Sequence, residues 1–344
     1  MESAPLSNEM RLIVTGGAGF IGSNFVYHAL RNGCHVLNID CLSYAAGLRM
    51  LDSIANDPGY AMVQADVANE SLVEEKLSEF CPNAIVHFAA ETHVDRSIAN
   101  ANAFVNSNIV GTFKLLTQVQ KYFQKLALDQ QHSFRFLHVS TDEVYGSLGD
   151  LGSFTESSPY DPHSPYSATK AAADHLVRAW HSTYKLPILI VHPSNNYGPN
   201  QHPEKLIPMV IRSCLNKLPI PIYGSGQNVR DWLYVQDFCE AILLVLCKGQ
   251  VGQSYNVGAN NQWNNLQLVN YLCDLVDEMR WNSEVSSPSR KLVQFVEDRP
   301  GHDFRYSMDC SKIATHCGWR PRHSWEDGLR KTIRWYLENP ERLG

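Results

Sequence analysis

Two neighbouring acids and a tyrosine–lysine pair are the residues of this sequence best suited to chemistry. Asp142 and Glu143 follow directly after a strand-like run. Two carboxyl groups this close push one pKa upward, so that one donates a proton while its neighbour acts as a base. Tyr166 and Lys170 stand one turn apart in a predicted helix, where an ammonium group beside a phenol lowers the pKa of the phenol. Each pair alone is also typical of a solvated surface, so the interpretation depends on the elements around it.

A glycine-rich turn near the N-terminus predicts a dinucleotide site. Residues 15–22 read T-G-G-A-G-F-I-G between a predicted strand and a predicted helix, in a register that starts at Gly16 or at Gly17. Such a turn brings the backbone close to a pyrophosphate at the helix N-terminus. Asp40 ends the second predicted strand, where a carboxylate accepts hydrogen bonds from a ribose diol and repels a 2′-phosphate, which favours NAD over NADP. The contacts expected here are Gly16, Gly19, Phe20, Ile21, Gly22 and Asp40.

Two further strand ends point to the same ligand, because ligands gather at the carboxyl edge of a parallel sheet. Asp66 ends the third predicted strand, where its carboxylate either binds the adenine amino group or caps the following helix. Ala89 and Ala90 end the fourth, where small side chains either leave room for a cofactor or simply pack.

Strand-like and helical patterns alternate through the first half of the chain. This alternation predicts an α/β fold, a doubly wound parallel sheet of the Rossmann type with right-handed crossovers. Strands are expected at Arg11–Thr15, His35–Ile39, Tyr60–Gln64, Ala84–Phe88, Phe134–Ser140 and Leu186–Val191, and helices at Phe20–Arg31, Ser71–Phe80, Ala103–Lys125, Tyr166–Tyr184 and Trp325–Leu337.

Proline and glycine become frequent after residue 195, and the elements become shorter. This change predicts a smaller, discontinuous α/β lobe that binds the substrate. We expect residues 10–195 to form the NAD-binding domain, with the segment 229–258 returning to it, and residues 196–344 to form mainly the substrate lobe.

Composition excludes several classes of protein. The 344 residues are 44% hydrophobic and 19% charged, as in soluble globular chains of one or two domains. A net charge of −6 without a basic block argues against nucleic-acid binding, and no run approaches the roughly 20 apolar residues of a membrane span. Nine cysteines without a C-x-x-C pair predict reduced thiols and no metal site. We therefore expect a cytoplasmic protein that binds neither nucleic acid nor membranes.

Longer motifs resemble the extended short-chain dehydrogenase/reductase family. G-G-A-G-F-I-G at 16–22, H-F-A-A at 87–90 and Y-S-A-T-K at 166–170 carry this resemblance over most of the chain. S-T-D-E-V-Y-G at 140–146 and A-A-E-T-H-V-D-R-S at 89–97 narrow it to nucleotide-sugar 4,6-dehydratases, and most closely to those that act on dTDP-glucose. Four later segments resemble the substrate-binding segments of that family: S-N-N-Y-G-P at 194–199, P-E-K-L-I-P at 203–208, R-D-W-L-Y-V at 230–235 and D-R-P-G-H-D at 298–303.

The resemblance implies a redox-neutral dehydration of dTDP-glucose to dTDP-4-keto-6-deoxyglucose with NAD as a retained cofactor. Tyr166 takes the proton of the 4-hydroxyl as hydride leaves carbon 4, while Thr141 bonds the oxygen and Lys170 holds the phenolate. Glu143 then removes the proton on carbon 5 while Asp142 donates to the leaving 6-hydroxyl. Hydride finally returns to carbon 6.

The resemblance also assigns binding roles beyond the reacting groups. Lys205, Arg230, Arg299 and His302 are expected to supply positive charge for the diphosphate. His93 is expected either to lie behind the residues that touch the ligands or simply to be buried. Further cofactor contacts are expected at Ser43, Val67, Thr92, Ser107 and Asn196, with Tyr166 and Lys170. Further substrate contacts are expected at Thr92, Thr141, Asn195, Leu206, Pro221, Tyr223, Asn265 and Tyr306.

Alternatives remain at this point. The same chemistry on UDP-glucose or another nucleotide sugar is not separated from the first interpretation by the sequence. An epimerase or decarboxylase does not need the acid pair, and a catalytically silent NAD-binding protein usually loses the tyrosine or its lysine.

The resemblance finally implies a homodimer. The helices expected over 103–125 and 166–184 would pack against those of a second copy, with Phe113, Leu116, Val177 and Trp180 as the apolar positions left for this contact. Burial against the sheet explains these four side chains equally well.

Overall fold

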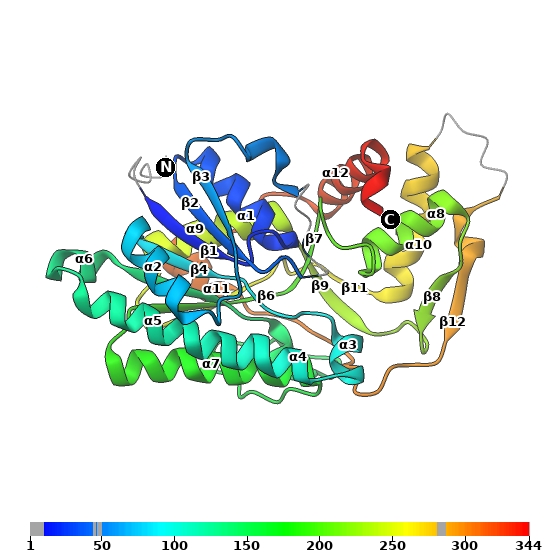
Figure 1. Ribbon diagram of the computed structural model, residues 1–344. Coiled ribbons are helices and arrows are strands. Elements are labelled where there is room, and N and C mark those ends of the chain that lie inside the picture. Colours follow the sequence, from blue (N-terminus) through cyan, green and yellow to red (C-terminus); the bar gives the residue numbers. More distant parts are fainter. Residues whose placement is uncertain (1–9, 44–45, 47–49, 281–286, 344) are drawn as a thin grey trace.

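Seven parallel strands form the central sheet of the protein (Figure 1). The computed structural model describes residues 10–43, 46, 50–280 and 287–343; the first nine residues and the end of the expected substrate lobe at Gly344 lie outside them. The strand order is β10-β6-β5-β4-β1-β2-β3. From β1 the chain adds strands in one direction, and from β4 it adds them in the other, which confirms the doubly wound fold. The strands are β1 (Arg11–Thr15), β2 (His35–Asp40), β3 (Tyr60–Gln64), β4 (Ala84–His87), β5 (Arg135–Val139), β6 (Ile188–Pro193) and β10 (Ser254–Val257).

Helices cover both faces of this sheet because successive strand residues point to opposite sides. In β1, Leu12 and Val14 join one apolar cluster and Ile13 joins the other. The first cluster includes helices α1 (Phe20–Arg31), α9 (Val235–Lys248) and α11 (Ser311–Cys317). The second includes α2 (Glu70–Phe80), α5 (Thr112–Lys125) and α7 (Pro165–Tyr184).

The helix expected over 103–125 is not one regular helix. It consists of α4 (Asn102–Phe104), the π-helical turn η3 (Val105–Gly111) and α5. Within the π-helical turn, the buried Asn108 accepts the Glu91 N–H at 2.8 Å and donates to the Glu91 carbonyl and to the Thr169 hydroxyl. The turn therefore ties this helix to the loop after β4 and to α7, which is a use typical of π-helical turns near functional sites.

The four apolar positions considered for a dimer contact divide into two classes. Leu116 and Val177 are fully buried against the sheet, so the simpler explanation holds for them. Phe113 remains 44% exposed and packs edge-on against the half-buried Trp180, with 5.9 Å between ring centroids. Only this second pair lies on the outer surface of α5 and α7.

A second group of elements follows residue 194 (Figure 1, right). It contains a three-stranded sheet, a two-stranded parallel sheet and three helices around their own apolar cluster. The bounds are β7 (Asn195–Tyr197), β9 (Val229–Tyr234) and β11 (Gln262–Asn264) for the first sheet, β8 (Ile220–Tyr223) and β12 (Val293–Val296) for the second, and α8 (Leu206–Asn216), α10 (Asn265–Met279) and α12 (Trp325–Glu338) for the helices.

Short helical segments complete the chain. None of the helices that the structure describes is both long and apolar enough to cross a bilayer. The short segments are η2 (Asp52–Ile54), α3 (Val94–Ala99), α6 (Leu128–Ser133), η4 (Asp142–Tyr145), η5 (Ser289–Leu292) and η6 (Pro340–Leu343).

The turn between β1 and α1 depends on the absence of side chains at three of its glycines, and a Cβ at Gly17 would lie 2.3 Å from Oδ1 of the buried Asn38. Gly16 has a φ of +72°, and a Cβ there would lie 2.6 Å from the backbone nitrogen of Ala89. A Cβ at Gly22 would lie 2.2 Å from the Gly16 carbonyl oxygen. At Gly19, by contrast, the nearest atom to such a Cβ would be 3.4 Å away. These three glycines therefore allow the close packing, whereas Gly19 does not need to be glycine for steric reasons.

Replacing Gly22 tests this packing. We expect Gly22→Ala to lower the free energy of unfolding by about 1–3 kcal/mol, because the added methyl group meets backbone that cannot move aside. The matched control Gly19→Ala should stay within about 1 kcal/mol of the parent protein. Thermal unfolding followed by circular dichroism measures both, and equal melting temperatures for the two variants would contradict the steric argument.

Candidate active site

A cavity of about 650 Å³ opens where β1, β2, β4 and β5 end. This is the edge at which parallel α/β sheets bind ligands, beside the switch point between β1 and β4. The cavity is lined by all residues that the sequence predicted as cofactor contacts or catalytic groups. These are Gly16, Gly19, Phe20, Ile21, Gly22, Asp40, Ser43, Asp66, Val67, Ala89, Ala90, Thr92, Ser107, Thr141, Asp142, Glu143, Tyr166, Lys170 and Asn196.

The glycine turn and the end of β2 form a cradle at one end of the cavity. Asn38 Oδ1 accepts the Gly17 N–H at 3.0 Å, and the buried Asp40 accepts the N–H groups of Ala18 and Leu42, both at 2.8 Å. Burial raises the pKa of Asp40, and these two backbone hydrogen bonds oppose the rise. Each oxygen of Asp40 retains a lone pair for a ribose hydroxyl. The bare backbone at Gly16 and the acceptor at Asp40 fit a dinucleotide.

Asp66 does not cap the helix that follows it. The N-cap of α2 is Asn69, whose side chain accepts the Leu72 N–H at 3.3 Å. Asp66 instead accepts the Ala68 N–H at 2.8 Å, because the chain makes an additional turn between β3 and α2. The capping alternative was therefore wrong, and the adenine contact remains a prediction for a carboxylate on the cavity wall.

The acid pair stands just past the end of β5. Thr141 accepts the Glu143 N–H at 3.3 Å and so begins the short 3₁₀ turn η4. A 3₁₀ turn removes the strict alternation of a strand, and both Asp142 and Glu143 reach the same cavity. Asp142 is 2% exposed, whereas Glu143 is only half-buried.

Surrounding charges give the two acids different proton affinities. Burial raises the pKa of Asp142 well above its ordinary range, and the negative charge of Glu143 raises it further. Burial also raises the pKa of Glu143, but Arg230 and Lys205 oppose that rise. Asp142 is therefore the better proton donor, and Glu143 is the acid that cations help to keep ionised.

Tyr166 and Lys170 lie on the buried face of α7, whose N-terminus is fixed by a cap at Ser164. The Lys170 ammonium donates to the Val139 carbonyl at 2.8 Å, and burial lowers its pKa to about 8. Burial raises the pKa of Tyr166, the charge of Glu143 adds to this, and a hydrogen bond with Thr141 opposes it. The prediction that the pKa of Tyr166 is lowered was therefore wrong: desolvation and nearby negative charge raise it.

The predicted diphosphate cations do not all reach this cavity. Lys205 lines it and donates to the Thr92 carbonyl at 3.3 Å. Arg230 is buried outside the cavity wall, where it donates to the Asp303 carbonyl at 2.9 Å and lies over the ring of Tyr306 at 4.2 Å. Tyr306, predicted to border the nucleoside, is 3% exposed and donates to the Asp303 carboxylate at 2.5 Å. Arg230 and Tyr306 thus belong to a buried layer behind the site.

Arg299 and His302 lie farther out in the second lobe. Arg299 stacks over the Tyr223 ring at 4.7 Å and lies 3.5 Å from Asp95 on α3. His302 contacts Asp298 at 2.6 Å. The two residues and Tyr223 form one group outside the cavity wall, as the side chain of His302 also meets the edge of Tyr223.

The remaining predicted residues are divided between the cavity and its surroundings. Asn195 lines the cavity, whereas Leu206, Pro221 and Asn265 do not. His93 is half-buried and does not line the cavity: it caps α3 and lies 3.4 Å from Glu204, which does line the cavity.

Several residues of the cavity wall were not found by sequence reasoning. Gln201, His202 and Glu204 precede Lys205 in the chain, and Asn106 precedes Ser107. All four residues lie close in sequence to predicted contacts, and this closeness could have indicated them. A residue next to a predicted contact reaches the cavity, however, only when the local backbone directs its side chain there.

Thiols and metal ligands do not build a second centre within the described residues. All nine cysteines are free, and the buried pair Cys214 and Cys273 packs with 3.8 Å between sulfur atoms in the core of the second lobe. The described ranges contain no group of three or more His, Cys, Asp or Glu side chains placed to hold a metal ion.

Comparison with known proteins agrees with this geometry. Residues 13–332 match the family described as GDP-mannose 4,6 dehydratase. A dTDP-glucose 4,6-dehydratase of Xanthomonas campestris pv. campestris is 51% identical over 327 residues, which cover 95% of this chain and 93% of the relative. A protein of the same name from Neisseria gonorrhoeae is 48% identical over 334 residues and 96% of each chain.

Solved structures are similar over almost the full length. The crystal structure of DesIV, a dTDP-glucose 4,6-dehydratase from Streptomyces venezuelae with NAD and TYD bound, superposes with a TM-score of 0.87 at 44% identity and covers 96% of this chain and 98% of that one. A UDP-glucose 4-epimerase from Thermotoga maritima reaches 0.84 at only 26% identity, over 96% of this chain and 100% of that one. The scaffold is thus shared with epimerases, while the sequence follows the dehydratases, and the chain belongs to the dTDP-glucose 4,6-dehydratase family.

Proposed function

We propose that this chain converts dTDP-glucose to dTDP-4-keto-6-deoxyglucose with NAD as its cofactor. The observation that carries the proposal is the pair Asp142 and Glu143, which faces the same cavity as Tyr166 and the glycine turn. A hydride-transferring enzyme needs the tyrosine and the cofactor cradle. Only a reaction that also eliminates water needs a proton donor and a base side by side.

NAD, when bound, accepts a hydride from the sugar and later returns it. The glycine turn and the N-terminus of α1 would hold its pyrophosphate, and Asp40 would hold the adenosine ribose. The other residues proposed to contact the cofactor are Phe20, Ile21, Ser43, Asp66, Val67, Ala89, Ala90, Thr92, Ser107, Tyr166, Lys170 and Asn196.

Oxidation of the sugar requires a base for its 4-hydroxyl proton, and Tyr166 has this role. Burial raises the pKa of Tyr166, and the hydrogen bond with Thr141 opposes that rise. We propose that the Lys170 ammonium, one helical turn along α7, also stabilises the phenolate. Lys170 keeps its proton up to about pH 8. The buried ammonium thus supplies positive charge beside the base throughout the neutral range.

Water elimination follows from the contrast within the acid pair. The ketone at carbon 4 acidifies the hydrogen on carbon 5, and Glu143 removes it. Asp142, whose raised pKa keeps it protonated, donates that proton to the 6-hydroxyl as the carbon–oxygen bond breaks. This elimination leaves a double bond between carbons 5 and 6. The hydride taken from carbon 4 would return to carbon 6 and the proton held by Glu143 to carbon 5, so the sugar loses one water with no net oxidation.

The second lobe is proposed to bind the nucleotide end of the substrate. Thr92, Asn195 and Lys205 on the cavity wall would contact the sugar or its phosphate. Residues beyond the wall would extend this site outward when the substrate is bound, and these are Leu206, Pro221, Tyr223, Asn265, Arg299 and His302. Arg230 and Tyr306 would act from the buried layer behind the cavity.

The division of the chain into two lobes supports this arrangement. We propose residues 10–195, with 229–258, as the cofactor-binding unit, and residues 196–344 as mainly the substrate-binding unit. Separate apolar clusters support the division: α9 and β10 contribute to the large-sheet cluster, whereas α8, α10 and α12 contribute to another. Helix α11, although it lies within 196–344, also contributes to the large-sheet cluster. Part of the second unit, 281–286 and Gly344, lies outside the described residues.

A reducing compartment such as the cytoplasm is proposed for the protein. Nine free thiols support this, including the Cys214 and Cys273 pair in contact distance without a disulfide. Activity that survives in reducing buffer and is lost on oxidation would agree with that location.

Direct assay tests the proposed function. The purified protein should convert dTDP-glucose to a 4-ketosugar, detected by its chromophore in alkali and by the loss of one water in mass spectrometry. UDP-glucose in a parallel reaction tests the nucleotide, and faster turnover of UDP-glucose would contradict the dTDP assignment. No product from either would favour a catalytically silent NAD-binding protein.

Glu143→Gln separates oxidation from elimination. The variant keeps the shape of the side chain but has no base for carbon 5, so we expect product formation to fall by a factor on the order of 10²–10⁴. Cofactor should stay bound, because Glu143 is not among the residues proposed to hold the cofactor. The control Glu79→Gln removes an exposed acid on α2 and should leave turnover unchanged. Parent-like turnover in Glu143→Gln would rule out the proposed base.

A homodimer packed through α5 and α7 is also proposed. The outer surface of these helices carries Phe113, Trp180 and Tyr184, whose rings contact one another in sequence. Val110 at 37% and Tyr184 at 42% exposure extend this apolar patch beyond Phe113. An exposed patch of this kind on paired helices is typical of a protein–protein interface.

Sedimentation at micromolar concentration tests the dimer. We expect twice the chain mass of 38.8 kDa for the parent protein and the single-chain mass for Phe113→Asp, because a buried unpaired charge opposes association. The control Phe295→Asp alters an exposed phenylalanine on β12 and should remain dimeric. A monomeric parent protein would overturn the proposal.

A further inference from the structure

Helix α7 carries four ionisable side chains in succession, one turn apart. Tyr166, Lys170, Asp174 and Arg178 recur at every fourth residue and therefore share one face. The first two line the cavity, whereas Asp174 lies one turn deeper, is fully buried and is not part of the cavity wall. A fully buried carboxylate outside the site needs an explanation, because its desolvation is costly.

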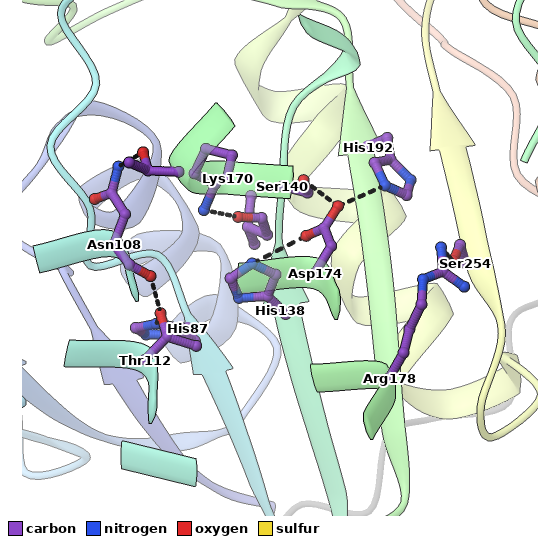
Figure 2. Close-up of polar contacts among 12 residues, drawn as sticks. His87, Asn108, Thr112, His138, Ser140, Lys170, Asp174, Arg178, His192 and Ser254 are labelled. Carbon is purple, nitrogen blue, oxygen red and sulfur yellow. Dashed lines mark hydrogen bonds and ion pairs between the residues drawn. The ribbon is translucent and has the colours of Figure 1, made fainter. Parts of the chain in front are cut away.

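Asp174 is surrounded by polar side chains from three segments, and Figure 2 shows three of them, His138, Ser140 and His192. Its Oδ2 atom accepts the hydroxyl of Ser140 at 2.8 Å, the hydroxyl of Tyr160 at 2.8 Å and Nε2 of His192 at 3.1 Å. Its Oδ1 atom lies 3.2 Å from Nε2 of His138. One carboxylate thereby joins β5, β6 and the loop before α7.

These contacts keep Asp174 negatively charged. Burial alone would raise its pKa, but the close contacts with His138 and His192 hold it well below its ordinary range. Burial also lowers the pKa of His138 to about 4, so this imidazole is neutral at pH 7. The nearby cations on the same helix face are Lys170 and Arg178, and the charge of Asp174 raises the pKa of both.

The same carboxylate reaches the catalytic segment through Ser140. Ser140 immediately precedes Thr141, Asp142 and Glu143, and its neighbour Val139 accepts the hydrogen bond from Lys170. Two adjacent residues at the end of β5 are thus held by two successive turns of α7. Displacing either turn would shift the start of the segment that carries the acid pair.

We infer that Asp174 is a positioning residue for the dehydration, which fixes Ser140 at the base of the catalytic segment and supplies the buried counter-charge for the Lys170 ammonium. This inference rests on the proposed function. It assigns a role in catalysis to a side chain that contacts neither the cavity nor the reacting groups.

The pH dependence follows from the groups around the two charges. Asp174 faces His138 on β5, His192 on β6, Tyr160, and Tyr145 of η4, with Arg178 on its own helix. Lys170 additionally faces His87 on β4. The pKa of Lys170, about 8, lies below the ordinary value for lysine, so Lys170 loses its proton as the pH rises through about 8. Loss of the counter-charge would lower that pKa further.

Asp174→Asn tests the inference, because it keeps the shape and removes the charge. The parent protein should lose kcat/KM as pH rises through about 8. In the variant we expect this alkaline limb to move down by about one pH unit and kcat at pH 8 to fall about tenfold, with KM for dTDP-glucose unchanged. The control Asp129→Asn removes an exposed carboxylate on α6 and should keep the parent profile. An unshifted limb in folded Asp174→Asn would overturn the counter-charge role.

Ser140→Ala tests the other half and remains informative when Asp174→Asn does not fold. It removes the hydroxyl tether and keeps the buried charge, so we expect kcat to fall about tenfold while the alkaline limb stays in place. Parent-like kcat would overturn the positioning role. An inactive parent protein would instead contradict the proposed function, so the two failures are distinguishable.

Discussion

Desolvation of charge is the constraint on which the site depends. Asp142, Tyr166 and Lys170 are all withdrawn from water, and each can hold or release a proton only as far as its neighbours replace the lost hydration. The chain supplies this replacement from different elements: a strand-end carbonyl for the ammonium, cations of the second lobe for Glu143, and a threonine for the phenol. Fixed dipoles and charges of the α/β scaffold therefore take the place of water around the reacting groups.

Much of this site could be predicted because its first layer is local in sequence. The strand and helix around the glycine turn coincide with β1 and α1, and parallel strands bring their carboxyl ends to one edge whatever their separation along the chain. Asp40 and the acid pair are therefore placed by topology alone. The spacing of Tyr166 and Lys170 likewise needs only helical periodicity.

The second layer could not be predicted for a physical reason. Asp174 has four partners that are distant in sequence, and only the packing of α7 on β5 and β6 selects them from many polar residues. The helix cap at Asn69 in place of Asp66 depends on one additional turn, and the π-helical turn at Asn108 depends on a loop elsewhere in the chain. Arg230 and Tyr306 lie behind the cavity, although their motifs suggested direct contact.

The late position of β10 and α9 in the chain has a consequence for synthesis on the ribosome. A nascent chain that ends just after β6 contains six strands of the large sheet but lacks α9 and α11, which form much of the apolar cluster on one face. The part of that face that α9 and α11 cover stays exposed while the intervening residues of the second lobe are made. The growing polypeptide thus exposes an apolar surface until its last third leaves the ribosome. During this period it is most prone to aggregation and most dependent on chaperones.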